Sequence, residues 1–149
     1  MTISVIFFDL GDTLVTSRPR AWLPGAQALL KGLGEAGFRL GIISNTGDLA
    51  TRDAILDLLP AGFDLAVFEE QLVLFSSEVK REKPDPLIFK EAVKRAGVPA
   101  NQCLFVTENI VDTLMAQHVG MRTIRVQTAP NSDLAELQQT IMKFQDLIR

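Results

Sequence analysis

The chain has 149 residues and a hydrophobic fraction of 47%, which suits one globular domain with a full core and excludes a disordered or fibrous protein. Fifteen Lys and Arg against 18 Asp and Glu give a net charge of -3, so no overall positive field is available to hold a nucleic acid. The single Cys103 rules out an internal disulfide, and no apolar run approaches the ~20 residues of a membrane span. We expect a cytoplasmic protein with residues 1–149 in a single domain.

Four short apolar runs are continuous rather than alternating, which is typical of parallel strands buried on both faces. Between them, apolar residues recur with helical spacing. In chain order the pattern predicts a strand at 3–8, helix at 26–33, strand at 38–43, helix at 55–59, helix after 83, strand at 103–106, helix at 111–115, strand at 123–126 and helix at 134–148. This alternation predicts a doubly wound, Rossmann-like α/β fold with a parallel sheet.

Local signals refine the helix ends but leave one segment open. Pro24 and Gly25 open the first helix, Asn45 and Thr46 are available as caps for the second, and Pro84 is expected to start the third. Residues 64–75 are compatible with a short strand or a hairpin.

Polar side chains follow the predicted strands at their carboxyl ends, where open α/β sheets bind ligands. Asp9 follows the first strand, Ser44 ends the second, and Glu108 follows the third with Asp112 four residues on. Lys83 lies just before a helix. An isolated Asp is usually a turn or cap residue. Acids, a hydroxyl and a lysine together are the groups that hold a divalent metal and a phosphoryl group.

Four segments in order resemble the motifs of the haloacid dehalogenase (HAD) superfamily, a group made up mostly of phosphatases. The resemblance covers nearly the whole chain, and four matches at sensible spacing make it specific. The matching segments are Phe7-Phe8-Asp9-Leu10-Gly11-Asp12-Thr13-Leu14, Ile42-Ile43-Ser44-Asn45, Ser76-Ser77-Glu78-Val79 with Lys83-Pro84-Asp85-Pro86, and Leu104-Phe105-Val106-Thr107-Glu108 through Asp112.

The resemblance implies a role for each matched residue. Asp9 is expected to attack phosphorus and form an aspartyl-phosphate. Ser44, the backbone amides that follow it, Asn45 and Lys83 are expected to bind the phosphate of the substrate, with Lys83 also keeping Asp9 ionised. The implied cofactor is Mg²⁺, held by Asp9, the carbonyl of Gly11 and Glu108, with Asp112 reaching it directly or through water.

The chain departs from the phosphatase pattern in two of its motifs. Gly11 stands where an acid usually protonates the leaving group, and Asp12 on the opposite face of an extended segment cannot replace it. Thr107-Glu108 replaces the usual Gly-Asp, which lengthens one metal ligand by a methylene. Branches that lack the acid include dehalogenating and phosphonate-cleaving enzymes. A non-catalytic or non-phosphatase member that binds phosphate or a protein partner is therefore the alternative.

The spacing of the motifs leaves no room for an inserted cap domain, because the intervals from Asp9 to Ser44 and from Ser44 to Lys83 are filled by core elements. A capless site implies a phosphorylated substrate that is macromolecular or enclosed by a neighbouring subunit. The segment from Arg18 to Trp22 is the candidate rim. Two solvated arginines and a packed tryptophan are the favoured alternative for this segment.

A second class of protein carries similar groups at the ends of its strands. A response-regulator receiver also combines acids, a hydroxyl and a lysine, but its acceptor Asp follows a middle strand, whereas here that strand ends in Ser44. We expect His118 to lie on the surface and Cys103 to pack as a small apolar residue. The apolar stripe of the last helix fits the core and is also compatible with a homo-oligomer contact.

Overall fold

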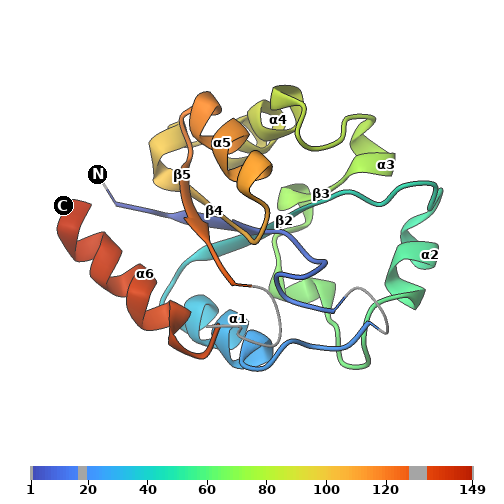
Figure 1. The fold of residues 1–149 in the computed structure, drawn as a ribbon, viewed down its shortest axis with the longest axis horizontal. Helices are drawn as coiled ribbons and strands as arrows, with labels where there is room; N and C mark the ends of the chain where they lie inside the picture. Colours follow the sequence, from blue (N-terminus) through green and yellow to red (C-terminus); the bar gives the residue numbers. More distant parts are fainter. Residues whose placement is uncertain (1, 17–19, 128–133, 149) are drawn as a thin grey trace.

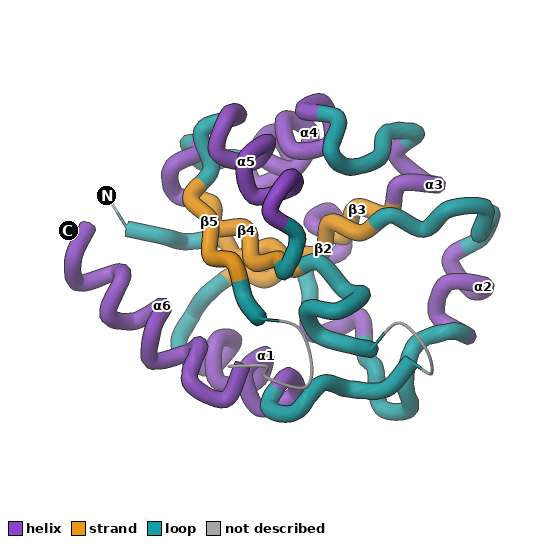
Figure 2. The backbone as a smooth tube through the Cα atoms, in the orientation of Figure 1, coloured by secondary structure: helices purple, strands orange, loops and turns teal. Residues whose placement is uncertain are grey.

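The computed structural model describes residues 2–16, 20–127 and 134–148. Five parallel strands form one sheet in the order β3-β2-β1-β4-β5 (Figures 1 and 2). The strands are β1 (Val5–Phe8), β2 (Arg39–Ser44), β3 (Val73–Phe75), β4 (Cys103–Thr107) and β5 (Arg122–Arg125). The chain moves outward from β1 through β2 and β3 and then returns to the other side of β1 for β4 and β5. This is a doubly wound α/β fold whose switch point lies between β1 and β4.

Helices cover both faces of the sheet (Figure 1). One layer contains α1 (Ala26–Glu35) and α6 (Leu134–Ile148), and the other contains α4 (Pro86–Ala96) and α5 (Ile110–Val119). Alternate residues of β1 enter two hydrophobic clusters: Ile6 and Phe8 pack with the α1 and α6 layer, and Val5 and Phe7 with the α4 and α5 layer. The central strand is therefore apolar on both faces, which explains its continuous hydrophobic sequence.

The four predicted strands are confirmed to within two residues at each end. The expectation of burial on both faces is wrong for β5, where Arg122, Thr123 and Ile124 are half-buried and Arg125 is exposed. β5 is an edge strand that pairs only with β4, and its two arginines keep their charged ends in water.

The connection between β2 and β3 contains α2 (Arg52–Asp57), η1 (Leu65–Val67) and η2 (Glu70–Leu72), and α3 (Ser76–Val79) follows β3. The segment left open by the sequence thus holds two 3-10 turns and the short edge strand β3, parallel to β2, and not a hairpin. Before β4, residues Ala100–Gln102 form a third 3-10 turn, η3.

Two expected helix starts are wrong. The side chain of Thr51, not Asn45 or Thr46, caps α2 by accepting from the amide of Ala54 at 3.2 Å. α4 begins at Pro86, with Asp85 as its cap, and not at Pro84. Proline fits the first helical turn in either case, so only the cap geometry distinguishes the two positions.

Neither interval between the site motifs holds a cap domain within the described ranges. Between β1 and α1, the described residues form a turn and two single bridges, Gly11 with Val15 and Val15 with Trp22. The interval between β2 and Lys83 is occupied by the short elements named above. No helix in the described part of the chain has the length and apolar character needed to cross a membrane.

Candidate active site

The strand register brings Asp9, Ser44 and Thr107 to the same edge of the sheet. Phe8, the last residue of β1, pairs with Ile42 on one side and Val106 on the other. Asp9 continues this register, because its amide donates to the carbonyl oxygen of Val106 at 3.1 Å. Asp9 is 8% exposed and Ser44 6%. The site thus consists of nearly buried polar side chains at the carboxyl ends of β1, β2 and β4.

Lys83 joins the two buried acids of the site. Its Nζ lies 2.9 Å from Oδ1 of Asp9 and 3.4 Å from Oδ2 of Asp112. Only 3% of the Lys83 side chain is exposed, and its ammonium lies 5.6 Å from the ring centre of Phe105. A lysine this deeply buried needs such partners, because an unpaired charge in the core is costly.

Asn45 fastens the Lys83 loop to the end of β2. Its Oδ1 accepts from the main-chain amide of Lys83 at 2.8 Å, and its Nδ2 donates to the Lys83 carbonyl at 3.0 Å. The resemblance implied that phosphate is bound by Asn45 and the backbone amides after Ser44. Both polar atoms of the Asn45 side chain are engaged with Lys83, so a phosphate contact of Asn45 would come from its backbone amide. In this structure Asn45 positions the lysine.

Thr107, at the end of β4, orients the Asp9 carboxylate. This role of Thr107 was not predicted from the sequence. Its hydroxyl donates to Oδ2 of Asp9 at 3.2 Å and accepts from the amide of Asn109 at 3.1 Å. Oδ1 of Asp9 also accepts from the amide of Leu10 at 2.8 Å. Both carboxylate oxygens of Asp9 therefore have protein donors. A hydroxyl at the end of the strand next to β1 was the available signal.

Glu108 and Asp112 complete an acidic side of the site. Burial, reinforced by the charges of Asp9, Asp12 and Asp112, raises the pKa of Glu108 above its ordinary value. Burial also raises the pKa of Asp112, and Lys83 opposes this shift in part. Negative charge therefore exceeds positive charge around Glu108, which favours binding of a cation there.

Ser44 offers a hydroxyl that is ready for a ligand. No hydrogen bond joins its side chain to any other described residue, although Ser44 is nearly buried. The amide of Thr46, by contrast, already donates to Oγ of Ser76 at 2.8 Å. The backbone amides after Ser44 were expected to bind the phosphate, but the amide of Thr46 is already hydrogen-bonded to Ser76.

Gly11 and Asp12 belong to a tight turn, so the assumption of an extended segment after Asp9 is wrong. The carbonyl of Leu10 accepts from the amides of Thr13, Leu14 and Val15. The left-handed residue of the turn is Asp12, with φ 60°, and its side chain is exposed.

The candidate rim is placed only in part. Arg18 lies outside the described residues, and Arg20 is exposed. Trp22 stacks on Phe63, with ring centres 5.2 Å apart, and donates to the carbonyl of Ala61, which supports the packing alternative. As expected, His118 is exposed and Cys103 is fully buried.

A family model of haloacid dehalogenase-like hydrolases matches residues 19–120. Glyceraldehyde 3-phosphate phosphatase from Pyrococcus abyssi is 35% identical over 103 residues, which cover 68% of this chain and 41% of that protein. (S)-2-haloacid dehalogenase 4A from Burkholderia cepacia is 29% identical over 129 residues, covering 83% and 52%. The chain spans about half or less of the length of these curated relatives.

Among solved structures, a HAD family enzyme from Bacteroides thetaiotaomicron, in complex with magnesium and inorganic phosphate, shares the fold with a TM-score of 0.70. It is 15% identical, and the match covers 87% of this chain and 96% of that one. The family match begins after Asp9, so the place of Asp9 in the first motif rests on its position at the end of β1. Because the family match covers more than half of the residues and the sheet has the same fold, the chain belongs to the haloacid dehalogenase-like hydrolases.

Proposed function

We propose that the protein is a magnesium-dependent phosphatase in which Asp9 is the nucleophile. The observation that carries this proposal is the buried pair of Asp9 and Lys83 at the end of the central strand, 2.9 Å apart. Protein donors on both oxygens orient the Asp9 carboxylate for attack, and the adjacent ammonium offsets the charge of a phosphoryl group. The relative named glyceraldehyde 3-phosphate phosphatase supports a phosphate ester as substrate.

In the first step, a carboxylate oxygen of Asp9 bonds to phosphorus while the bond from phosphorus to the alcohol oxygen breaks. Gly11 supplies no acid, so the departing alkoxide takes its proton from water. A second water then attacks the phosphorus of the aspartyl-phosphate, which releases inorganic phosphate and restores Asp9. The Ser44 hydroxyl and the Lys83 ammonium bind the phosphoryl oxygens, and Asn45 holds Lys83 in place.

We propose Mg²⁺ as the cofactor of this site. This ion usually takes one or two protein carboxylates and fills its other positions with water and substrate oxygens. Among the described residues, no group of three or more His, Cys, Asp or Glu side chains is placed to hold a metal ion on its own, so water and substrate oxygens would complete the coordination. We assign Asp9, Glu108 and the Gly11 carbonyl as ligands, with Asp112 binding directly or through water. When bound, the ion shields the charges of nucleophile and phosphate from one another.

The substrate is proposed to be either part of a macromolecule or enclosed by a neighbouring subunit, because no cap lies over the site within the described ranges. A cap serves to exclude water from the reacting groups. Here the partner or the substrate itself has to do so.

The decisive test compares a panel of phosphate esters, with Mg²⁺ and with EDTA, for the wild type, Asp9→Asn and Asp57→Asn. Asp57 is exposed at the end of α2 and provides a control with the same chemical change. We expect turnover that requires Mg²⁺, persists in Asp57→Asn and falls to background in Asp9→Asn. Equal turnover in Asp9→Asn and wild type overturns the Asp9 mechanism. Absence of turnover in all three favours a non-catalytic phosphate-binding or interaction protein.

Dehalogenation of a 2-haloacid is a second candidate, favoured by the full set of protein donors on Asp9 and by Gly11 in the acid position. In that reaction a carboxylate oxygen of Asp9 displaces halide from carbon, and water hydrolyses the resulting ester. A halide leaves without being protonated, so the lack of an acid at Gly11 does not slow this reaction. The relative named (S)-2-haloacid dehalogenase 4A supports this candidate. Chloride release from 2-chloropropionate in EDTA, without turnover of phosphate esters, would select it.

A further inference from the structure

A small cavity lies beside the site, on the side away from Glu108. It has a volume of about 210 Å³ and is lined by Gly47, Ser76, Ser77, Lys80, Arg81 and Glu82. These residues come from the turn after β2 and from the segment after β3. Ser44 pairs with Phe75 in the sheet, so both segments leave the sheet at the carboxyl edge that carries Asp9.

Chain length limits how far this cavity is from the phosphate-binding groups. Gly47 is three residues beyond Ser44, which places their Cα atoms at most ~11 Å apart, and Arg81 is two residues before Lys83, at most ~7 Å. The hydroxyls of Thr46, Ser76 and Ser77 tie the two walls together, with Thr46 Oγ1 donating to Ser77 Oγ at 2.8 Å. The lining of the cavity is thus close along the chain to Ser44 and Lys83, the two residues proposed to bind the phosphoryl group.

The two sides of the site differ in charge. The β4 side carries Glu108 and Asp112, the carboxylates assigned to the metal. On the cavity side, Lys80 and Arg81 are exposed, and no ion pair joins either of them to a described carboxylate. Glu82 is the acid of the lining, so the lining carries a net positive charge.

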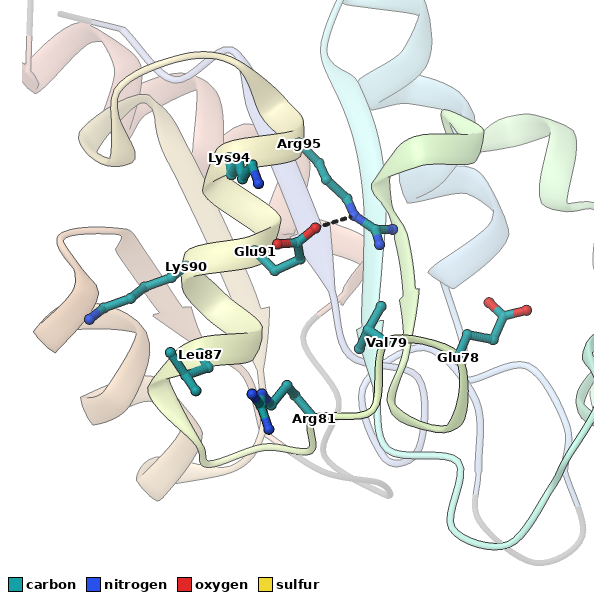
Figure 3. Close-up of a pocket in the computed structure, with 8 residues that line it drawn as sticks. All are labelled: Glu78, Val79, Arg81, Leu87, Lys90, Glu91, Lys94 and Arg95. Atoms are coloured by element: carbon teal, nitrogen blue, oxygen red, sulfur yellow. Dashed lines mark hydrogen bonds and ion pairs between the residues drawn. The ribbon is translucent and has the colours of Figure 1, made fainter.

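Positive charge continues outward from Arg81. Figure 3 shows Arg81 reaching from the loop after α3 toward Leu87 at the start of α4, where it also borders a second cavity of about 520 Å³. Lys90, Lys94 and Arg95 line that cavity from α4, and its Glu91 is paired with Arg95 at 3.0 Å. An anionic group of a substrate that extends from the site toward Arg81 is therefore attracted by these positive side chains.

We propose that Lys80 and Arg81 form a subsite for a second anionic group of the substrate, which makes the preferred substrate a phosphate ester whose alcohol carries a carboxylate or another phosphate. This inference rests on the proposed phosphatase function. A guanidinium and an ammonium that no ion pair joins to a described carboxylate can bind such a group with charge-assisted hydrogen bonds. The Ser77 hydroxyl and the Gly47 backbone line the same space.

The test compares 3-phosphoglycerate with glycerol 3-phosphate, which lacks the carboxylate. The double variant Lys80→Gln/Arg81→Gln is set against a control, Lys31→Gln/Lys143→Gln, that removes the same charge from exposed lysines of α1 and α6. We expect wild type and control to prefer 3-phosphoglycerate. In the double variant, kcat/KM for 3-phosphoglycerate should fall about 10-fold to 100-fold, mainly through KM, while glycerol 3-phosphate changes less than about 3-fold.

Equal losses for both esters overturn the subsite, because they would mean that the double variant disturbs the Lys83 loop. Absence of turnover for both esters refutes the proposed function instead. In that case calorimetry with the Asp9→Asn protein decides the subsite: tighter binding of 3-phosphoglycerate that depends on Lys80 and Arg81 supports it, and equal binding of the two esters overturns it.

Discussion

Replacing Lys83 by methionine removes the ammonium between Asp9 and Asp112 but keeps the apolar stem of the side chain. At an effective dielectric constant of ~20, the Coulomb attraction is roughly 6 kcal/mol at the separation from Asp9 and roughly 5 kcal/mol at that from Asp112. Desolvation cancels much of this. Breaking a buried pair from one side typically costs about 3–5 kcal/mol, which lowers Tm by about 6–20 °C for a chain of this size.

The loss of stability should depend on pH in a defined direction. Burial raises the pKa of Asp112 and Lys83 opposes the shift, so removing Lys83 raises this pKa further. A carboxyl group whose pKa is higher in the folded than in the unfolded state destabilises the fold when it is ionised. The loss of stability in Lys83→Met is therefore largest at neutral pH. It becomes smaller as the pH falls through the raised pKa of Asp112 toward the ordinary value of 3.8.

The assay is thermal unfolding followed by circular dichroism in EDTA, at pH values from 7.5 down to 4.5. Lys143→Met, on the exposed face of α6, is the control and should melt like wild type at every pH. A Tm deficit below about 2 °C for Lys83→Met, or one that stays constant with pH, would refute the argument that this lysine supports the fold by neutralising buried acids.

Three further outcomes are expected. Thr107→Val should lower kcat/KM about 10-fold to 100-fold by removing the hydrogen bond to Asp9, while Thr107→Ser keeps most of it; equal losses in both variants would contradict this role. Gly11→Asp should raise turnover of alkyl phosphates ~10²–10⁴-fold and that of aryl phosphates much less, provided the variant melts like wild type; a folded variant without a selective gain means that the missing acid is not limiting. Burial raises the pKa of Cys103 to about 11, so Ellman's reagent at pH 8 should label this thiol only after unfolding; fast labelling of the native protein would argue against its burial.

Local sequence patterns were sufficient to predict the class of fold and the groups at the strand ends. Continuous apolar runs indicate strands buried on both faces wherever a strand has neighbours on both sides, as β1 does. The same pattern was misleading for β5 because nothing in its sequence says that it is an edge strand. Polar residues after the strands could be placed at one edge because parallel strands present all their carboxyl ends together.

The working geometry of the site was decided by tertiary structure. Lys83 was expected just before a helix and close to Asp9, but its burial and its contact with Asp112 emerge only in the folded chain. The side chain of Asn45 binds the main chain of Lys83, 38 residues away, a contact that no sequence pattern indicated. The hydroxyl of Thr107 donates a hydrogen bond to Asp9, which is 98 residues away in the sequence. Periodicity and capping rules describe contacts within a few residues along the chain, whereas these partners meet only once the sheet and its crossovers have assembled.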